Sequence, residues 1–381
     1  MSINIIVLGA GFGGLEASTG LKRELGKDVS VTLVDKKDYF MTGFNKYDIL
    51  FGREADIRKG YYRDLVGQGV DFLQEEVVSL ELEEKRVVTD KRALSYDYLI
   101  VALGADLHPE AIPRFVSGGY EFYSPEGARR LRPVIEAFQG GTILISIFDK
   151  VYKCPPAPYE LAFLLDDYFR AKGMRERVNL KVLTPVPRPL PVSPTASDEI
   201  ERLLAECNIE LLTQRRVIEL DSEHQCAIVE GHSPLAYDLF IGIPIHKPPK
   251  VILDSPLGAA GWVAVDRENL HTSIDNVYAV GDVTSIPVGG FAVPKAGVFA
   301  ENAARVVVQD LVSRIRNRPA ASRYEARGAC FVEFGRGRIA MLDADFLSQA
   351  QPQVVLKDIP GEVAPKKTFV AERLRRWFGY G

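Results

Sequence analysis

The 381-residue chain has no long apolar run and no strong excess of either charge. No stretch approaches the roughly 18 consecutive apolar residues that a membrane-spanning helix needs. The formal net charge of −4 provides no basic surface for nucleic acid, so no nucleic-acid partner is expected. Residues 1–4 lead directly into an apolar strand without a charged-then-apolar leader, and we therefore expect a cytoplasmic protein.

Cysteine is scarce, with four residues at positions 154, 207, 226 and 330. Such wide spacing does not build a disulfide framework, and no C-x-x-C pair indicates zinc, so we expect no metal site. In a reducing compartment a disulfide among them would be typical of catalysis rather than of structure. Cys207 lies on the apolar side of an expected helix over 197–207, which predicts a core thiol, and Cys226 is expected to be a packing or surface residue.

A glycine-rich loop is also missing from the middle of the chain. An apolar strand over 142–148 is followed by the segment CPPAPYE at 154–160 and by an expected helix over 161–171. A flavoenzyme that binds a second dinucleotide would carry glycines here, because only glycine lets the backbone approach a pyrophosphate closely. Three prolines also remove N–H donors that phosphates need. We therefore expect no nicotinamide at this loop and assign the chemistry to the thiol of Cys154.

The N-terminus, in contrast, carries a dinucleotide-binding pattern. A buried strand over 5–8 is followed by G-x-G-x-x-G and by the start of a helix. Gly9, Gly11 and Gly14 would allow a tight turn, close approach of a pyrophosphate and close packing of helix on strand. A second strand ends at Asp35, where its carboxylate is expected to accept a hydrogen bond from a ribose hydroxyl.

Two later segments favour FAD over NAD for this loop. Residues 98–105 form an apolar strand that ends in small residues, and residues 277–283 form another that ends in Gly-Asp. With the N-terminal loop, they resemble segments of the two-domain flavoprotein disulfide reductase superfamily, in which the last Asp lies on the ribityl chain of the flavin. Lys295 precedes a helix start, where a cation and backbone donors would stabilise negative charge on the flavin. The candidate FAD residues are Gly9, Gly11, Phe12, Gly14, Asp35, Lys36, Val77, Ala102, Gly104, Gly281, Asp282, Lys295 and Gly297.

The FAD motifs lie in two parts of the chain separated by a second strand-helix-strand unit. This order predicts an α/β protein with two Rossmann-like dinucleotide-binding domains, the second inserted in the first. We expect a discontinuous FAD-binding domain over 1–106 and 255–320 and an inserted domain over 107–254 that lacks a glycine loop. A small C-terminal α+β domain is expected over 321–381.

The segments around the cysteines narrow the resemblance. The pattern C-x-x-A-P-Y-E at 154–160, the segments 261–266 and 294–301, and the late Cys330 resemble the sulfide:quinone oxidoreductase family. The flavoprotein subunit of flavocytochrome c sulfide dehydrogenase shares much of this pattern. The resemblance covers essentially the whole chain, and its specific part is the Cys154 segment together with Cys330.

The resemblance implies a redox mechanism. Cys154 and Cys330 would form a redox pair on one face of the flavin, with quinone approaching the other face near the C-terminal segment. Hydrosulfide would attack the link between the two cysteines and leave a persulfide, and two electrons would pass to FAD and then to quinone. Glu160 is the expected proton carrier. Cys154 precedes a helix, whose N-terminus is expected to lower the pKa of the thiol.

Two departures from the family affect the substrate and the cofactor. Many members carry a third cysteine before the strand at 142–148, but the region 105–141 has none, so a related thiol remains open as the substrate. The loop at 39–46 lacks the cysteine that tethers flavin in flavocytochrome c subunits, and noncovalent FAD is expected. Alternative functions are a type II NADH:quinone oxidoreductase-like enzyme and a non-catalytic flavoprotein redox sensor or electron-transfer subunit.

The C-terminal tail over 366–380 mixes five basic residues with an apolar stripe. On a helix this pattern predicts contact with an anionic membrane surface or a partner, although a helix that docks on its own domain would look similar. The first reading predicts a peripheral protein on the inner face of the cell membrane. The sequence leaves a homo-oligomer open. His108 and His246 lie beside prolines without metal-ligand spacing and are expected to be structural.

Overall fold

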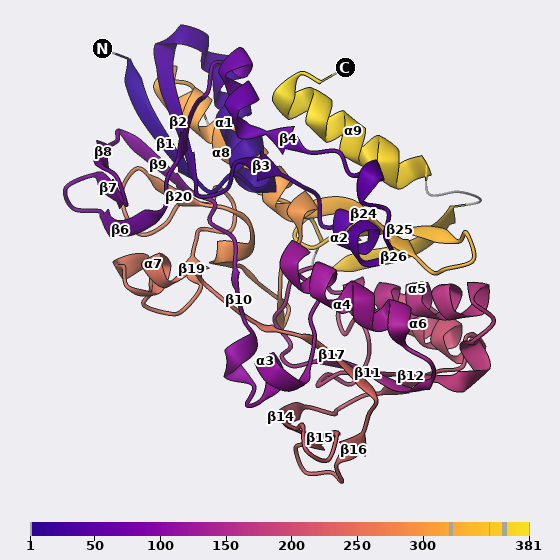
Figure 1. Ribbon diagram of the computed structural model, residues 1–381. Coiled ribbons are helices and arrows are strands. Elements are labelled where there is room, and N and C mark those ends of the chain that lie inside the picture. Colours follow the sequence, from indigo (N-terminus) through magenta and orange to yellow (C-terminus); the bar gives the residue numbers. More distant parts are fainter. Residues whose placement is uncertain (1, 320–322, 350, 360–363, 381) are drawn as a thin grey trace.

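The computed structural model describes residues 2–319, 323–349, 351–359 and 364–380. Its largest sheet has five parallel strands in the spatial order β20-β9-β1-β2-β5 (Figure 1). These strands are β1 (Ile3–Leu8), β2 (Val29–Asp35), β5 (Asp71–Gln74), β9 (Tyr98–Val101) and β20 (Val277–Ala279). One sheet thus joins the two distant parts of the sequence that carry the predicted FAD motifs.

Residues of β1 alternate between the two faces of this sheet. Ile5 and Val7 face a core that also contains residues of helices α1 (Phe12–Leu25) and α8 (Gly297–Ile315). Ile6 and Leu8 belong to a second core on the other face. The elements that cover this second face are β6 (Val77–Glu81), β7 (Arg86–Thr89), β8 (Ala93–Ser95) and α7 (Lys250–Leu253).

A second parallel sheet has four strands in the order β13-β12-β11-β17. Helices cover one face of it, and α3 together with a small antiparallel sheet covers the other (Figure 1). The strands are β11 (Gly141–Ile147), β12 (Val178–Leu183), β13 (Ile209–Leu212) and β17 (Leu239–Ile243). The helices and small strands are α3 (Phe115–Gly118), α4 (Pro125–Ala137), α5 (Ala157–Ala171), α6 (Pro194–Glu206), β14 (Val217–Asp221), β15 (Cys226–Val229) and β16 (Leu235–Ala236).

The two large sheets confirm the predicted α/β fold class, while the domain boundaries stay a prediction. The chain passes between the sheets in an antiparallel pair made by β10 (Asp106–His108) and β18 (Ile245–Lys247). The remaining short elements are β3 (Tyr39–Phe40), α2 (Asn45–Leu50), β4 (Gly60–Tyr61), β19 (Val263–Ala264), β21 (Thr284–Ser285), β22 (Pro287–Val288) and β23 (Phe291–Ala292). Turns of 3₁₀ helix occur at Gly26–Asp28, Glu54–Asp56, Tyr62–Gln68, Pro109–Ala111, Arg175–Arg177, Pro256–Gly258 and Gly281–Val283.

The C-terminal part is a three-stranded antiparallel sheet followed by a helix. It consists of β24 (Arg327–Glu333), β25 (Ile339–Asp345), β26 (Gln353–Ile359) and α9 (Ala364–Phe378). Cys330 lies in the middle of β24, where it pairs with Leu342 of β25. The residues before and after it in the sequence are also part of the strand, so its backbone conformation is fixed.

The apolar stripe of α9 is buried against its own chain (Figure 1). Its members are Phe369, Val370, Leu374, Trp377 and Phe378, all buried in the core that α1 and α8 share. The prediction that this stripe contacts a membrane or a partner is therefore wrong, and the alternative of a helix docked on its own domain is correct. Apolar side chains that are already packed in a core gain nothing from a lipid surface.

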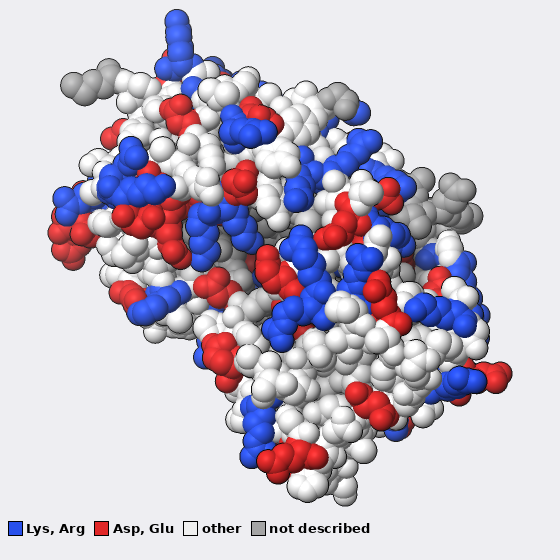
Figure 2. All heavy atoms as spheres, in the orientation of Figure 1, with Lys and Arg blue, Asp and Glu red and all other residues white. Residues whose placement is uncertain are grey.

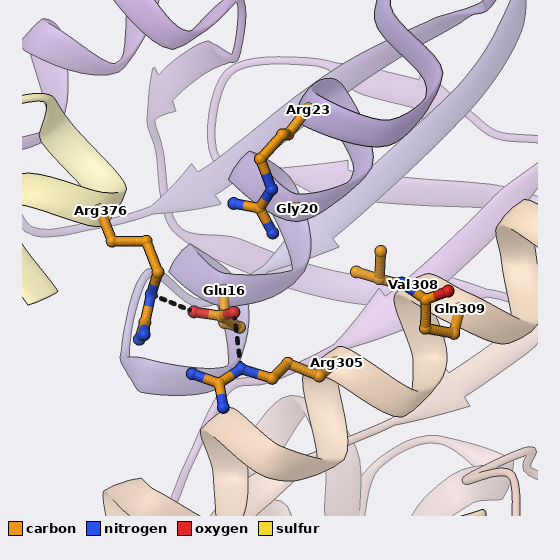
Figure 3. A pocket seen from close by; sticks show the side chains of 7 residues that line it. All are labelled: Glu16, Gly20, Arg23, Arg305, Val308, Gln309 and Arg376. Carbon is orange, nitrogen blue, oxygen red and sulfur yellow. Dashed lines mark hydrogen bonds and ion pairs between the residues drawn. The ribbon is translucent and has the colours of Figure 1, made fainter. Parts of the chain in front are cut away.

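Buried carboxylates of the FAD-domain helices hold the polar side of α9 in place. Glu16 of α1 accepts a hydrogen bond from Trp377 Nε1 at 2.6 Å, and Arg376 Nε lies 3.0 Å from the same carboxylate oxygen. Glu301 of α8 pairs with Arg373 at 2.8 Å. Figure 3 shows Arg305 and Arg376 converging on Glu16 beside a surface hollow of about 390 Å³. No candidate site residue lines this hollow, and the charged side chains around it hold α9 against α1 and α8.

Charges of both signs are interspersed over the face of the molecule seen in Figure 2. This pattern matches the small net charge of −4. Within the described ranges, no helix has both the length and the apolar character required to cross a membrane.

Candidate active site

The glycine loop after β1 has the shape of a phosphate-binding cradle. Gly9 has a φ of +92°, and a Cβ there would lie 2.4 Å from the carbonyl oxygen of Ala102. A Cβ on Gly14 would lie 1.8 Å from the carbonyl oxygen of Gly9. A Cβ on Gly11, in contrast, would meet no described atom within 4 Å. The loop is thus closed on the protein side and open at Gly11, as close approach of a pyrophosphate requires.

Asp35 orders this loop through backbone hydrogen bonds. One carboxylate oxygen accepts from the Ala10 N–H at 2.7 Å, and the other accepts from the Lys37 N–H at 2.9 Å. Each oxygen retains a lone pair, so a further bond from a ribose hydroxyl is compatible with this geometry and stays a prediction. Lys36 points elsewhere and pairs with Glu76 at 3.0 Å on the surface.

Asp282 has an unpartnered carboxylate oxygen in the interior. Its Oδ1 is buried and has no hydrogen-bond partner in the described chain. Burial raises the pKa of Asp282, and the nearby cations Lys153 and Lys295 oppose that shift. Unpartnered buried oxygens are costly, and this one matches a ligand that donates from a hydroxyl, such as the ribityl chain of FAD.

Lys295 lies beside Asp282 and immediately before α8. Its Nζ donates to the carbonyl oxygens of Asp282 at 2.7 Å and Thr284 at 3.0 Å, and it lies 3.4 Å from the centroid of the Trp262 ring. Burial lowers the pKa of Lys295 to about 8. A buried cation at a helix start is the arrangement that would stabilise negative charge on a flavin.

The remaining candidate FAD residues lie near this cradle or are peripheral to it. Phe12 packs edge-on against Trp377 and occupies the space where a Cβ on Gly297 would lie, 2.5 Å from its ring. Gly281 and Gly104 have φ values of +77° and +73°, which glycine adopts without strain. Val77 is half-buried at the start of β6, and Ala102 is buried beneath Gly9. Direct contact of each with FAD stays a prediction.

The Cys154 loop leaves no backbone donor for a phosphate. The Cys154 N–H donates to the carbonyl oxygen of Lys295 at 2.7 Å, and the Ala157 N–H donates to the carbonyl oxygen of Cys154 at 2.9 Å. Tyr159 and Glu160 both donate to the carbonyl oxygen of Pro156, at 3.1 and 3.0 Å. The three other residues of 154–160 are prolines without an N–H. Every amide of the segment is thus absent or already bonded.

Cys154 and Cys330 come together although they are far apart in sequence. Cys154 precedes α5, and Glu160 on α5 accepts from the Glu333 amide of β24 at 2.9 Å, which ties the two elements together. The charge of Cys154 contributes to raising the pKa of Cys330, after the larger effect of burial. Both residues are half-buried, and neither cysteine forms a disulfide in this structure. Cys154 has a φ of +54°, a conformation that side chains disfavour and that is concentrated at functional sites.

The predicted lowering of the Cys154 pKa is wrong. Burial raises the pKa of Cys154 to about 11, the carboxylate of Glu160 raises it further, and the cations Lys46 and Lys366 oppose the shift. The helix starts only at Ala157, and the amides of its first turn are bonded or replaced by proline. Little of the positive end of the helix is therefore available to the thiolate.

Glu160 is joined to the C-terminal helix by a buried ion pair. Lys366 Nζ lies 2.5 Å from Glu160 Oε1 and 2.8 Å from Glu333 Oε1. Burial raises the pKa of Glu160, and Lys366 lowers it. A carboxyl group whose pKa is raised by burial and lowered by a cation, and which lies beside two thiols, is suited to proton transfer. In the sequence Lys366 belongs to a basic tail, and no local pattern connects it with the residues around 160.

Comparison with known proteins shows which proteins the chain resembles. Residues 3–129 match the family model described as pyridine nucleotide-disulphide oxidoreductase. The mitochondrial sulfide:quinone oxidoreductase of Mus musculus is 25% identical, over 91% of this chain and 78% of that protein. The sulfide-quinone reductase of Aquifex aeolicus is 25% identical, over 100% of this chain and 88% of that protein. The chain is thus similar over nearly its whole length to proteins named sulfide:quinone oxidoreductase or sulfide-quinone reductase.

A solved structure has the same fold. The sulfide:quinone oxidoreductase of Aquifex aeolicus superposes with a TM-score of 0.87 at 22% identity, covering 100% of this chain and 93% of that chain. These similarities, together with the match to the pyridine nucleotide-disulphide oxidoreductase model, confirm the predicted resemblance and the predicted FAD cofactor. The roles of individual residues stay predictions.

No functional role was predicted from the sequence for three residues that lie near the cysteines. Lys46 of α2 and Tyr123, which precedes α4, received no role, and His246 of β18 was expected to be structural. Tyr123 and His246 are 5% and 3% exposed, and the Lys46 Nζ lies 4.4 Å from the centroid of the Tyr123 ring. Isolated residues on separate elements carry no motif, so only packing could reveal them. The other cysteines behave as expected, with Cys207 buried and Cys226 half-buried in β15.

Proposed function

We propose that the protein oxidises sulfide, or a related low-molecular-weight sulfur compound, through Cys154 and Cys330, with FAD as cofactor and a quinone as electron acceptor. The observation that carries the proposal is the meeting of these two thiols beside Glu160, at a loop that has lost its phosphate-binding glycines. The relatives named sulfide:quinone oxidoreductase support the same substrate and acceptor.

The first chemical step concerns only sulfur atoms of the substrate and the cysteines. With Cys154 and Cys330 joined as a disulfide, hydrosulfide attacks one of the two sulfurs, a new S–S bond forms, and the original bond breaks. One cysteine then carries a persulfide, and the other leaves with the bonding electron pair. A second hydrosulfide takes the outer sulfur of the persulfide and leaves as hydrodisulfide, so both cysteines are left reduced. When bound, FAD would supply two-electron chemistry, accepting the electron pair released as the two cysteines rejoin in a disulfide and passing it to the quinone.

The protein side chains handle the protons of this step. Because burial raises the pKa of Cys154 to about 11, its thiolate readily takes a proton after it leaves and must lose one before re-oxidation. Glu160 has a pKa that burial also raises, and its pairing with Lys366 keeps the carboxylate compensated. We assign Glu160 the exchange of that proton.

The proposal also covers where in the cell the protein meets its electron acceptor. We infer a peripheral location at the inner face of the cell membrane, because a quinone acceptor is dissolved in lipid. The apolar stripe of α9 is used inside the protein, so contact with lipid falls to other surfaces.

An NADH-oxidising function has weaker support. A nicotinamide dinucleotide in the second sheet would need free amides at the start of α5 for its pyrophosphate. Residues 154–160 offer none, because their amides are bonded within the chain or absent in proline.

An anaerobic titration tests the proposal. Sulfide should bleach the flavin absorbance near about 450 nm in the wild type, and Cys154→Ser and Cys330→Ser should each abolish bleaching. Cys207→Ser is the matched control, because it alters a buried thiol of the α6 core and should leave bleaching intact. Bleaching that persists in both active-site variants, or faster bleaching by NADH than by sulfide, would contradict the mechanism. A purified protein without sulfide-dependent quinone reduction would instead indicate a redox sensor.

A further inference from the structure

Three polar groups around Cys154 have no part in the chemistry above and no partner in the described chain. The hydroxyl of Tyr123 and the Nε2 of His246 are buried without a hydrogen bond. The ammonium group of Lys46 makes no ion pair or hydrogen bond with any described residue and contacts the aromatic ring of Tyr123. Buried polar atoms are nearly always satisfied in folded proteins, so two unsatisfied ones beside a half-buried, unpaired cation indicate a ligand.

The three groups converge from separate elements. Lys46 lies on α2, Tyr123 precedes α4, and His246 lies on β18. The rings of Tyr123 and His246 are 5.4 Å apart in an edge-on arrangement, and the Lys46 Nζ lies 4.4 Å from the Tyr123 ring centroid. Cys154 packs against the same hydrophobic core that contains Tyr123, and its charge acts on the pKa values of both Lys46 and Tyr123. The cluster therefore adjoins the reactive thiol.

The hydrogen-bonding capacity of each group follows from its surroundings. The Nδ1 of His246 lies 2.7 Å from the carbonyl oxygen of Pro244 and must donate to it, which leaves Nε2 as an acceptor. Burial lowers the pKa of His246 to about 3, so the ring stays neutral. The hydroxyl of Tyr123 stays protonated, because burial raises its pKa well above the usual range, and it acts as a donor. Burial lowers the pKa of Lys46 to about 8, which leaves it mostly cationic near neutral pH.

We infer that Lys46, Tyr123 and His246 form a substrate subsite beside Cys154 that binds hydrosulfide. The cation and the hydroxyl stabilise the negative sulfur, and the single S–H of hydrosulfide donates to His246 Nε2. Thiosulfate has no such hydrogen, and its oxygens would face the lone pair of His246. The subsite thus selects a protonated sulfur anion over a sulfur oxyanion. This inference rests on the proposed function.

Stopped-flow reduction of the flavin in the holoenzyme by sulfide tests the subsite. Tyr123→Phe and Lys46→Met should each raise the sulfide concentration for half-maximal rate by about tenfold or more, because each removes a hydrogen bond to a charged ligand. Tyr237→Phe is the matched control. Its hydroxyl is also buried and unpartnered, but it lies in the separate core around Phe240. That variant should leave the half-saturating concentration unchanged, and thiosulfate should not compete with sulfide in the wild type.

The outcomes separate the subsite from the overall function. If sulfide reduces the wild type and both Tyr123→Phe and Lys46→Met keep its half-saturating concentration, the subsite is refuted and the proposed function stands. The subsite is also refuted if these variants shift the flavin spectrum or midpoint potential before sulfide is added, because the groups then serve the flavin. A wild type that sulfide does not reduce refutes the proposed function itself. Thermal unfolding of Tyr123→Phe at or above the wild-type temperature verifies that the variant folds.

Discussion

Replacing Lys366 with methionine would remove the cation that pairs with two buried carboxylates. Lys366 is 5% exposed, and its partners Glu160 and Glu333 are 2% and 12% exposed. Methionine is close to lysine in length and apolar, so the change removes the charge with little change in packing. Glu160 would retain only the amide N–H of Glu333 as a described donor.

The expected loss follows from the cost of an uncompensated buried charge. Removing one partner of a buried ion pair destabilises a fold by about 3–5 kcal/mol. We expect the lower end of that range at acidic pH, because Glu160 can become neutral by taking up a proton. Its pKa is already raised by burial and would lose the opposing effect of Lys366.

The sign of the pH dependence follows from that raised pKa. An acid whose folded pKa is raised contributes stability that is present below its unfolded pKa and is lost as pH rises through the folded value. Without Lys366 the pKa of Glu160 in the folded protein rises further, so the pH range over which stability is lost extends to higher pH. The destabilisation of Lys366→Met should therefore be larger near about pH 8 than near about pH 5.

Urea unfolding of the holoenzyme at the two pH values measures this difference. Lys357→Met is the matched control, because Lys357 pairs with Asp343 at 2.7 Å within the C-terminal sheet but is 51% exposed. Exposed pairs contribute about 0–1 kcal/mol, and the control should lose no more than that. An Lys366→Met variant as stable as the control at both pH values would refute the reasoning about the buried pair. Equal losses at both pH values would refute the role of Glu160 protonation.

Further predictions concern the cofactor loop, the docked helix and the thiol. Gly11→Val should fold but purify without FAD, because the new side chain fills only the open space at the loop. Gly14→Ala should fail to fold, because its Cβ would lie 1.8 Å from the carbonyl oxygen of Gly9. Flavin absorbance and circular dichroism distinguish loss of FAD from loss of folding. Trp377→Phe should lower unfolding stability by about 1.5–3 kcal/mol through loss of its hydrogen bond to Glu16, measured by urea denaturation. Alkylation of reduced Cys154 by iodoacetamide, followed by mass spectrometry, should be slow at neutral pH and rise toward about pH 11.

Several features of the fold and site could be predicted from local patterns. The strand and glycine pattern at 5–14 predicts a phosphate-binding turn, because the conformations and close approaches needed there are available only to glycine. The prolines of 154–160 exclude backbone donors by their covalent structure alone. The family resemblance rested on similar short segments, and it extended to the late Cys330.

Other features depended on packing and were predicted wrongly or not at all. The tail over 366–380 has an amphipathic pattern that fits a membrane or a protein core equally well, and only its burial against α1 and α8 distinguished them. A helix N-terminus predicted a lowered pKa for Cys154, but the surrounding protein raises it. The contact of Lys46 with Tyr123 and the ion pair of Lys366 with Glu160 join elements that no sequence spacing connects.

The sequence by itself determined what each segment can do: which loop can accept a phosphate, which cannot, and which thiols are available for chemistry. Only the tertiary structure decided which groups meet Cys154, whether its thiolate is favoured, and what covers the apolar face of α9. The physical reason is that backbone conformation and missing donors are local covalent properties. Desolvation and long-range charge interactions exist only after distant segments pack together.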